Sequence, residues 1–149
     1  MAVSGLLVFG AACSSGNTLA GGGPTPFSEK SDVISAGDSI CQQHLDAVKA
    51  ATDNFNSSHS NPSAADTLDF FTTIELPIED RTLGAIKRVG EPTKDRPQYD
   101  EAVKAWDQAL TKYKEAVAAD PVSVLKNGTK LFDDAKAKFK AYGFKTCGT

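Results

Sequence analysis

The chain has few of the residues from which catalytic and metal sites are usually built. It contains two histidines, three cysteines, one tryptophan and one methionine, and aromatic residues make up only 8% of it. Neither a Glu-x-x-His pair nor a Cys-x-x-Cys-His sequence occurs, which excludes the ligand patterns of di-iron bundles and of covalently attached haem. We therefore expect no catalytic residues, no metal and no cofactor.

Long apolar runs and a strong net charge are also absent. The apolar block Leu6 to Phe9 is far too short to cross a bilayer as a permanent helix. A formal charge of −3 over 149 residues gives no reason to expect a nucleic-acid partner. At this length the chain forms about one domain with a single core.

The N-terminal stretch LLVFGAACSSGNTLAGGGPTP runs from a short apolar block through small residues to Cys13. This order is similar to a bacterial lipobox, where the cysteine thiol is diacylglycerylated before the signal peptide is cleaved. Two features depart from that pattern: Gly10 stands where leucine is usual, and no basic residue precedes Lys30. We expect the true translation start to lie upstream of Met1. The alternative is a disordered N-terminus with an incidental cysteine.

The lipobox interpretation divides the chain into three parts. We expect a signal peptide, truncated at its N-terminus, over 1–12, a lipidated Cys13 with a flexible linker over 13–34, and a folded domain over 35–149. Two acyl chains would hold the protein stably on the extracytoplasmic face of the membrane, and about 20 flexible residues would reach roughly 25 Å from it. The expected partners are the membrane itself and an unidentified envelope protein or glycolipid.

The folded part contains four amphipathic segments at helical spacing. The first begins at Ser35, which resembles a capping box with Asp38, and ends near Asn56. The second follows Asn61-Pro62 and continues in phase across Pro77, which predicts one kinked helix. Its apolar stripe consists of Leu68, Phe71, Ile74, Ile78, Ala85 and Val89.

The third and fourth segments carry clear start and stop signals. The third spans Pro97 to Ala119, where apolar residues recur every three or four positions. The fourth begins at Pro121 and ends at Gly143, a typical C-cap residue. Within it, Asn127-Gly128 marks either a kink or a break, because a mid-helix glycine costs about 1 kcal/mol relative to alanine.

Four such helices with short connections predict an all-α, antiparallel up-down-up-down four-helix bundle. In that topology the start of the first helix and the end of the fourth lie together, so Cys41 should meet Cys147. Cysteine parity agrees, because two of three cysteines pair in an oxidising compartment and Cys13 is the single one. A disulfide closing a loop of about 105 residues would contribute at most about 4–5 kcal/mol.

The two cysteine-bearing segments carry a resemblance. DSIC at 38–41 and AYGFKTCG at 141–148 are similar to the two ends of small secreted or lipid-anchored helical proteins common in actinobacteria. The shared pattern is an early cysteine in the first helix and a Gly-apolar-x-x-Cys-Gly ending, and it covers the folded part only at its ends. Because those proteins mostly lack an assigned activity, the resemblance implies a fold and a location but no catalytic residues.

One segment imitates a catalytic motif. VISAGDSI at 33–40 looks like the Gly-Asp-Ser block of a family of serine esterases, in which Ser39 would be the nucleophile. Those enzymes need an Asp-x-x-His partner, and neither His44 nor His59 follows an aspartate at that spacing. Cys41 and His44 stand one turn apart, but two ligands make no structural metal site. A helix N-terminus explains the segment without catalysis.

We expect a non-catalytic binding or structural module in the cell envelope. An alternative is a carrier that holds an apolar small molecule or lipid between its helices, and a third is a serine hydrolase using Ser39. The carrier would need an apolar pocket lined by Phe70, Phe71, Trp106 and Phe139. The basic residues of the last helix either contact an anionic surface or form a solvated face that suits the helix dipole. These are Lys130, Lys136, Lys138 and Lys140.

Overall fold

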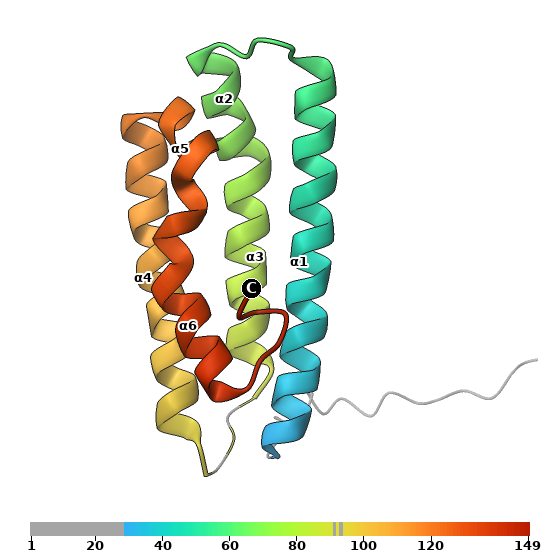
Figure 1. The fold of residues 1–149 in the computed structure, drawn as a ribbon, viewed down its shortest axis with the longest axis vertical. Coiled ribbons are helices and arrows are strands. Elements are labelled where there is room, and N and C mark those ends of the chain that lie inside the picture. Colours follow the sequence, from blue (N-terminus) through green and yellow to red (C-terminus); the bar gives the residue numbers. More distant parts are fainter. Residues whose placement is uncertain (1–28, 91, 93) are drawn as a thin grey trace, which may run out of the picture.

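The computed structural model describes residues 29–90, 92 and 94–149. The predicted signal peptide, the lipidation site Cys13 and most of the predicted linker lie outside these residues. The described part is all-helical, without strands, and its four helical stretches lie side by side along the long axis of the molecule (Figure 1). The prediction of an all-α fold is confirmed.

Each of the four helical stretches corresponds to one predicted segment. The second stretch contains a π-helical turn, η1, and the fourth contains a 3₁₀ segment, η2. The elements are α1 (Lys30–Ser58); α2 (Ala64–Phe70), η1 (Phe71–Glu75) and α3 (Leu76–Arg88); α4 (Arg96–Ala119); and α5 (Pro121–Asn127), η2 (Gly128–Phe132) and α6 (Asp133–Tyr142).

Helix α1 begins at Lys30, five residues before the predicted start at Ser35. The side chain of Val33 is fully buried in the core, so burial of apolar surface extends the helix backwards into the predicted linker. The capping box expected at Ser35 and Asp38 is therefore wrong. Asp38 lies inside α1, and its carboxylate instead accepts hydrogen bonds from the C-terminal segment.

The second stretch starts at a capping box, in which Ser63 Oγ accepts from the backbone N–H of Asp66 at 3.1 Å. The chain stays helical across Pro77, as predicted. Proline has no backbone N–H, and its ring crowds the carbonyl four residues earlier. The π turn just before it widens the helix: the N–H of Leu76 bonds the carbonyl of Phe71, five residues back.

The fourth stretch changes its helical type at Gly128, where sequence predicted a kink or a break. A Cβ atom at Gly128 would lie 2.6 Å from Cε2 of Tyr113, so only glycine lets this segment approach α4 so closely. The stretch starts as predicted, with Asp120 capping the N–H of Ser123 at 3.0 Å. It also ends as predicted at Gly143, which has a φ of +122°.

The predicted disulfide between Cys41 and Cys147 is confirmed, with the two Cα atoms 5.2 Å apart. It ties α1 to the segment that follows α6. Next to it, Asp38 accepts backbone N–H groups of Lys145 at 3.0 Å and Thr146 at 2.7 Å. Helix α4 packs against α6 and α3, and α3 also packs against α1. The disulfide and Asp38 therefore hold the C-terminal segment against α1.

Candidate functional site

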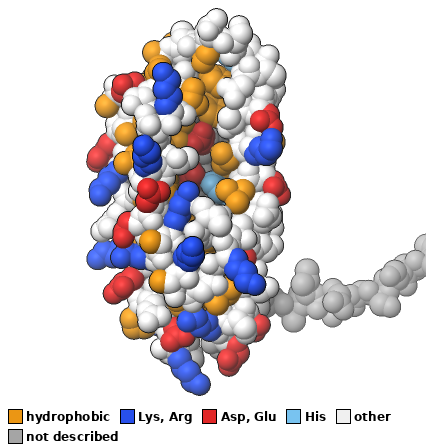
Figure 2. Space-filling view, in the orientation of Figure 1, with side chains coloured by type: hydrophobic (Ala, Val, Ile, Leu, Met, Phe, Trp, Pro, Cys, Tyr) orange, Lys and Arg blue, Asp and Glu red, His pale blue; other side chains and the backbone are white. Residues whose placement is uncertain are grey.

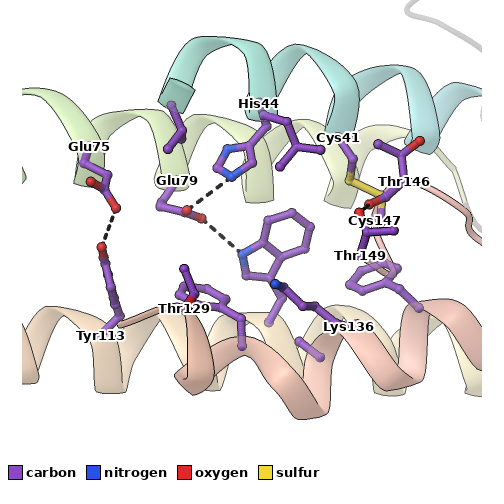
Figure 3. Close-up of a pocket in the computed structure, with 16 residues that line it drawn as sticks. Cys41, His44, Glu75, Glu79, Tyr113, Thr129, Lys136, Thr146, Cys147 and Thr149 are labelled. Carbon is purple, nitrogen blue, oxygen red and sulfur yellow. Dashed lines mark hydrogen bonds and ion pairs between the residues drawn. A yellow bond between two sulfur atoms is a disulfide. The ribbon is translucent and has the colours of Figure 1, made fainter. Parts of the chain in front are cut away.

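A cavity of about 160 Å³ lies between α1, the η1–α3 segment, α4 and the η2–α6 segment (Figure 3). The Cys41–Cys147 disulfide lines one end of it, and Glu75 with Tyr113 lines the other. All four helical stretches thus contribute to its wall. On the surface, hydrophobic side chains surround a hollow that contains acidic and histidine side chains (Figure 2).

Much of the cavity wall is apolar. Trp106 from α4 and Phe139 from α6 are both buried, and their rings meet edge to face with centroids 5.5 Å apart. Phe132 and Ala135 continue this wall along the fourth stretch. Leu45, which also lines the cavity, is 43% exposed. The apolar wall therefore reaches from the core to the surface of α1.

Glu79 is the most deeply buried acidic residue of the cavity, with 7% of its surface exposed. One carboxylate oxygen lies 3.3 Å from Nε2 of His44, and the other accepts the indole N–H of Trp106 at 3.4 Å. Both oxygens are therefore occupied by protein groups, as the dashed lines in Figure 3 indicate.

The second ring nitrogen of His44 also has a protein partner. Its Nδ1 lies 3.2 Å from the hydroxyl of Thr82, which donates its own hydrogen to the carbonyl of Ile78 at 2.9 Å. The Thr82 oxygen must therefore accept from Nδ1–H. Contacts with Thr82 and Glu79 therefore hold the imidazole ring of His44 at the cavity wall.

Glu75 lies one helical turn from Glu79 and has a different set of partners. The hydroxyl of Tyr113 donates to one of its carboxylate oxygens, and the other oxygen has no hydrogen-bond partner within the described residues. Burial raises the pKa of Glu75, the negative charge of Glu79 raises it further, and the bond from Tyr113 opposes both effects. Burial and the neighbouring Glu75 also raise the pKa of Tyr113.

Lys136 of α6 lines the cavity from the wall opposite Glu75 and is half-buried (Figure 3). Within the described residues it forms no ion pair. Of the other lysines expected to contact an anionic surface, Lys130 and Lys140 are exposed, and Lys138 pairs with Asp134 at 3.5 Å. Lys136 is therefore the predicted basic residue that contributes to the cavity.

Two of the four aromatic residues predicted for an apolar pocket, Trp106 and Phe139, line the cavity. Phe70 and Phe71 do not, and the prediction is corrected for them. Both are buried one turn beyond Glu75, where Phe70 stacks on Phe55 with centroids 4.6 Å apart and Phe71 meets the edge of Tyr113 at 5.8 Å. They fill the core beside the cavity and leave its wall to Glu75 and Tyr113.

The two glutamates are not among the predicted site residues, because the predicted apolar stripe of the second stretch continues through Ile74 and Ile78. The π turn places one extra residue in the helix and shifts the phase by one position. Ile74 is consequently 41% exposed, and Glu79 takes the buried position next to Ile78. Besides Pro77, the threonine pair just before it is a local signal of an irregular helix, because such hydroxyls bond to carbonyls of the preceding turn.

The remaining sequence candidates lie away from the cavity. Ser39 is exposed on α1, and its hydroxyl lies 3.5 Å from the side-chain nitrogen of Gln43. No group of three or more His, Cys, Asp or Glu residues in the described part of the chain is arranged to bind a metal ion. In the same part, no helix has the length and apolar character needed to cross a membrane.

Comparisons with protein-family models, with curated proteins and with solved structures found no match for this chain.

Proposed function

We propose that the protein is a cell-envelope lipoprotein whose helical domain is a non-catalytic module that binds a small, mainly apolar ligand in the cavity. The observation that carries this proposal is the cavity of about 160 Å³ against Trp106 and Phe139. Protein cores are close-packed and contain few voids larger than a water molecule. An apolar cavity of about 150 Å³ accepts a benzene ring. The cavity favours the carrier alternative over a purely structural module.

We further propose that the four helical stretches form an antiparallel up-down-up-down bundle that the disulfide closes at one end. Short connections over 59–63 and 89–95 and at Asp120 support this topology, because short loops join antiparallel neighbours. Such a bundle leaves the ligand site between α1 and α6, above the disulfide. The site is then open to solvent between α1 and α6, and the disulfide holds these two parts of the chain together at one end.

The location proposal rests on Cys13 and on the disulfide. Disulfides persist in oxidising compartments, which suits a domain on the extracytoplasmic face of the membrane. Mass spectrometry of the protein purified from its own membranes tests the anchor. We expect a diacylglyceryl group on Cys13 and its loss in Cys13→Ser, and an unmodified cysteine in the native protein would contradict the proposal.

The proposal that the module is non-catalytic is supported by the surroundings of Ser39 and His44. The imidazole of His44 contacts Thr82 and Glu79, whereas Ser39 is exposed and contacts Gln43. A serine nucleophile needs a base within hydrogen-bond reach. Esterase activity lost in Ser39→Ala would contradict this part of the proposal.

Ligand binding can be tested with benzyl alcohol, a neutral compound of one ring. Because Trp106 is the only tryptophan of the chain, its fluorescence reports on the cavity, and calorimetry gives the stoichiometry. We expect saturable binding of one molecule per chain. Ala135→Leu adds side-chain volume to the cavity wall and should weaken binding at least tenfold, whereas Ala141→Leu, exposed on the same helix, should not.

Circular dichroism of both variants checks that the helical content is retained. Absence of saturable binding by the unmodified protein would contradict the proposed function. Equal weakening by Ala135→Leu and Ala141→Leu would place the bound molecule outside the cavity.

A further inference from the structure

We propose that the ligand is an organic ammonium compound, with a ring-sized apolar body against Trp106 and a protonated amine that binds Glu75. This inference rests on the proposed function and specifies its ligand class. The carboxylate oxygen of Glu75 that Tyr113 leaves unoccupied is the acceptor for the amine. Two features of the cavity, its distribution of charge and its aromatic wall, support this assignment.

The two carboxylates of the cavity have different roles. Glu79 is occupied on both oxygens, by His44 at 3.3 Å and by Trp106 at 3.4 Å. Glu75 is occupied on one oxygen only, by Tyr113. An ammonium group donates up to three hydrogen bonds and carries the opposite charge. Glu75 is therefore the group in the cavity that can accept a new charge-assisted bond without breaking an existing one.

The other charged groups around Glu75 also favour a cation over an anion. Glu79, on the same helical stretch, raises the pKa of Glu75 by its negative charge, and His44 on α1 lowers it to a lesser extent. Lys136 is the opposing charge on α6, but it is half-buried and forms no ion pair in the described part of the chain. Long lysine side chains keep their ammonium group in water while the stem covers apolar surface. An anionic ligand against Trp106 would therefore meet the negative charges of Glu75 and Glu79, which Lys136 offsets only in part.

The aromatic side chains suit the apolar body of such a ligand and its charge. Rings of Trp106, Tyr113, Phe132 and Phe139 all line the cavity. Aromatic faces attract cations, and the attraction is stronger where the cation is desolvated. Burial also raises the pKa of Glu75, and a bound cation would offset that cost of desolvation. The cavity therefore offers aromatic side chains to the apolar ring of the ligand and the Glu75 carboxylate to its amine.

Three ligands of matched shape test the inference on the full chain at pH 8 and low salt: benzylammonium, benzyl alcohol and benzoate. We expect benzylammonium to bind at least tenfold more tightly than benzyl alcohol, and benzoate to bind more weakly than either. Glu75→Gln should reduce the affinity for benzylammonium to that for benzyl alcohol. Glu115→Gln, an exposed substitution of the same kind on α4, should leave both affinities unchanged.

Lys136→Gln should change the affinity for benzylammonium in the direction opposite to Glu75→Gln. Removal of this positive charge should tighten the binding of benzylammonium severalfold and leave benzyl alcohol unaffected, whereas a site for anions would lose affinity for benzoate.

The possible outcomes separate the two proposals. Equal affinities for benzylammonium and benzyl alcohol would overturn the assignment of an ammonium ligand and leave the binding function standing. A tenfold preference that survives in Glu75→Gln would overturn it as well, and so would tighter binding of benzoate. Failure of all three ligands to bind would overturn the proposed function itself.

Discussion

Ionised Glu75 lowers the stability of the fold, because burial removes water from its charge and Glu79 adds repulsion from one turn away. A carboxyl group whose pKa is raised in the folded state stabilises the fold while it is protonated. That contribution is complete below its ordinary pKa of 4.5 and is lost as the pH rises through the higher value of the folded state. Glu75 therefore makes the protein less stable at neutral pH.

Glu75→Gln should remove this pH dependence. We predict that the variant has nearly the stability of the unmodified protein at pH 4 and a higher melting temperature at pH 8. Tyr113, Glu79, His44 and Lys136, which line the same cavity, are present in both proteins. The comparison therefore isolates the charge of Glu75 together with its interactions with these groups. Thermal unfolding followed by circular dichroism measures the difference, and a variant that is less stable at pH 8 would contradict the prediction.

Gly128→Ala should destabilise the fold, although helix propensity alone would predict the opposite. Alanine should stabilise a helix by about 1 kcal/mol relative to glycine. At this position, however, the new Cβ would lie 2.6 Å from Tyr113 and 2.7 Å from Val124. We predict a net loss of about 1–3 kcal/mol from overpacking, measured by urea unfolding. A stabilised variant would show that the fourth stretch does not approach α4 closely.

At the scale of the element, regular helices with strong local signals were predictable and the irregular turn was not. Helix α4 was predicted within one residue, because proline, an apolar stripe and Asp120 mark it locally. The first helix begins earlier than predicted because its first turn is stabilised by a tertiary contact, the burial of Val33 in the core. The π turn before Pro77 has no reliable local signal, and it decides which side chains of α3 face the cavity.

Asp38 determines how the C-terminal segment is held against α1. Its carboxylate accepts the backbone N–H groups of Lys145 and Thr146. Bonds from a charged acceptor contribute about 1.5–3 kcal/mol each before desolvation costs are counted. We predict that Asp38→Asn speeds hydrogen exchange at these two amides at least tenfold, whereas Asp46→Asn, exposed on the same helix, does not. Unchanged exchange in Asp38→Asn would contradict this role.

At the scale of the whole molecule, the Cys41–Cys147 disulfide joins positions 106 residues apart. Closure of a loop of this length stabilises the fold by at most about 4–5 kcal/mol in the chain-entropy model. We predict that reduction lowers the urea midpoint accordingly and weakens ligand binding, because both cysteines line the cavity. Lost stability with unchanged binding would show that the cavity does not depend on the disulfide.

The disulfide was predictable, because helix order and cysteine parity each point to it. The cavity was predictable only in part. Trp106 and Phe139 follow from the apolar stripes, whereas Glu75, Glu79 and Tyr113 meet through the π turn and the close approach at Gly128. These are tertiary features that a periodic pattern does not contain.

The most direct test of the binding site is the position of a bound ligand, measured by nuclear Overhauser effects between benzylammonium and the labelled protein. We predict effects from the ring protons to the side chains of Trp106 and Phe139, and from the methylene next to the amine to Glu75. Effects confined to other parts of the surface, or a ring in the cavity with its amine directed away from Glu75, would contradict the proposed site.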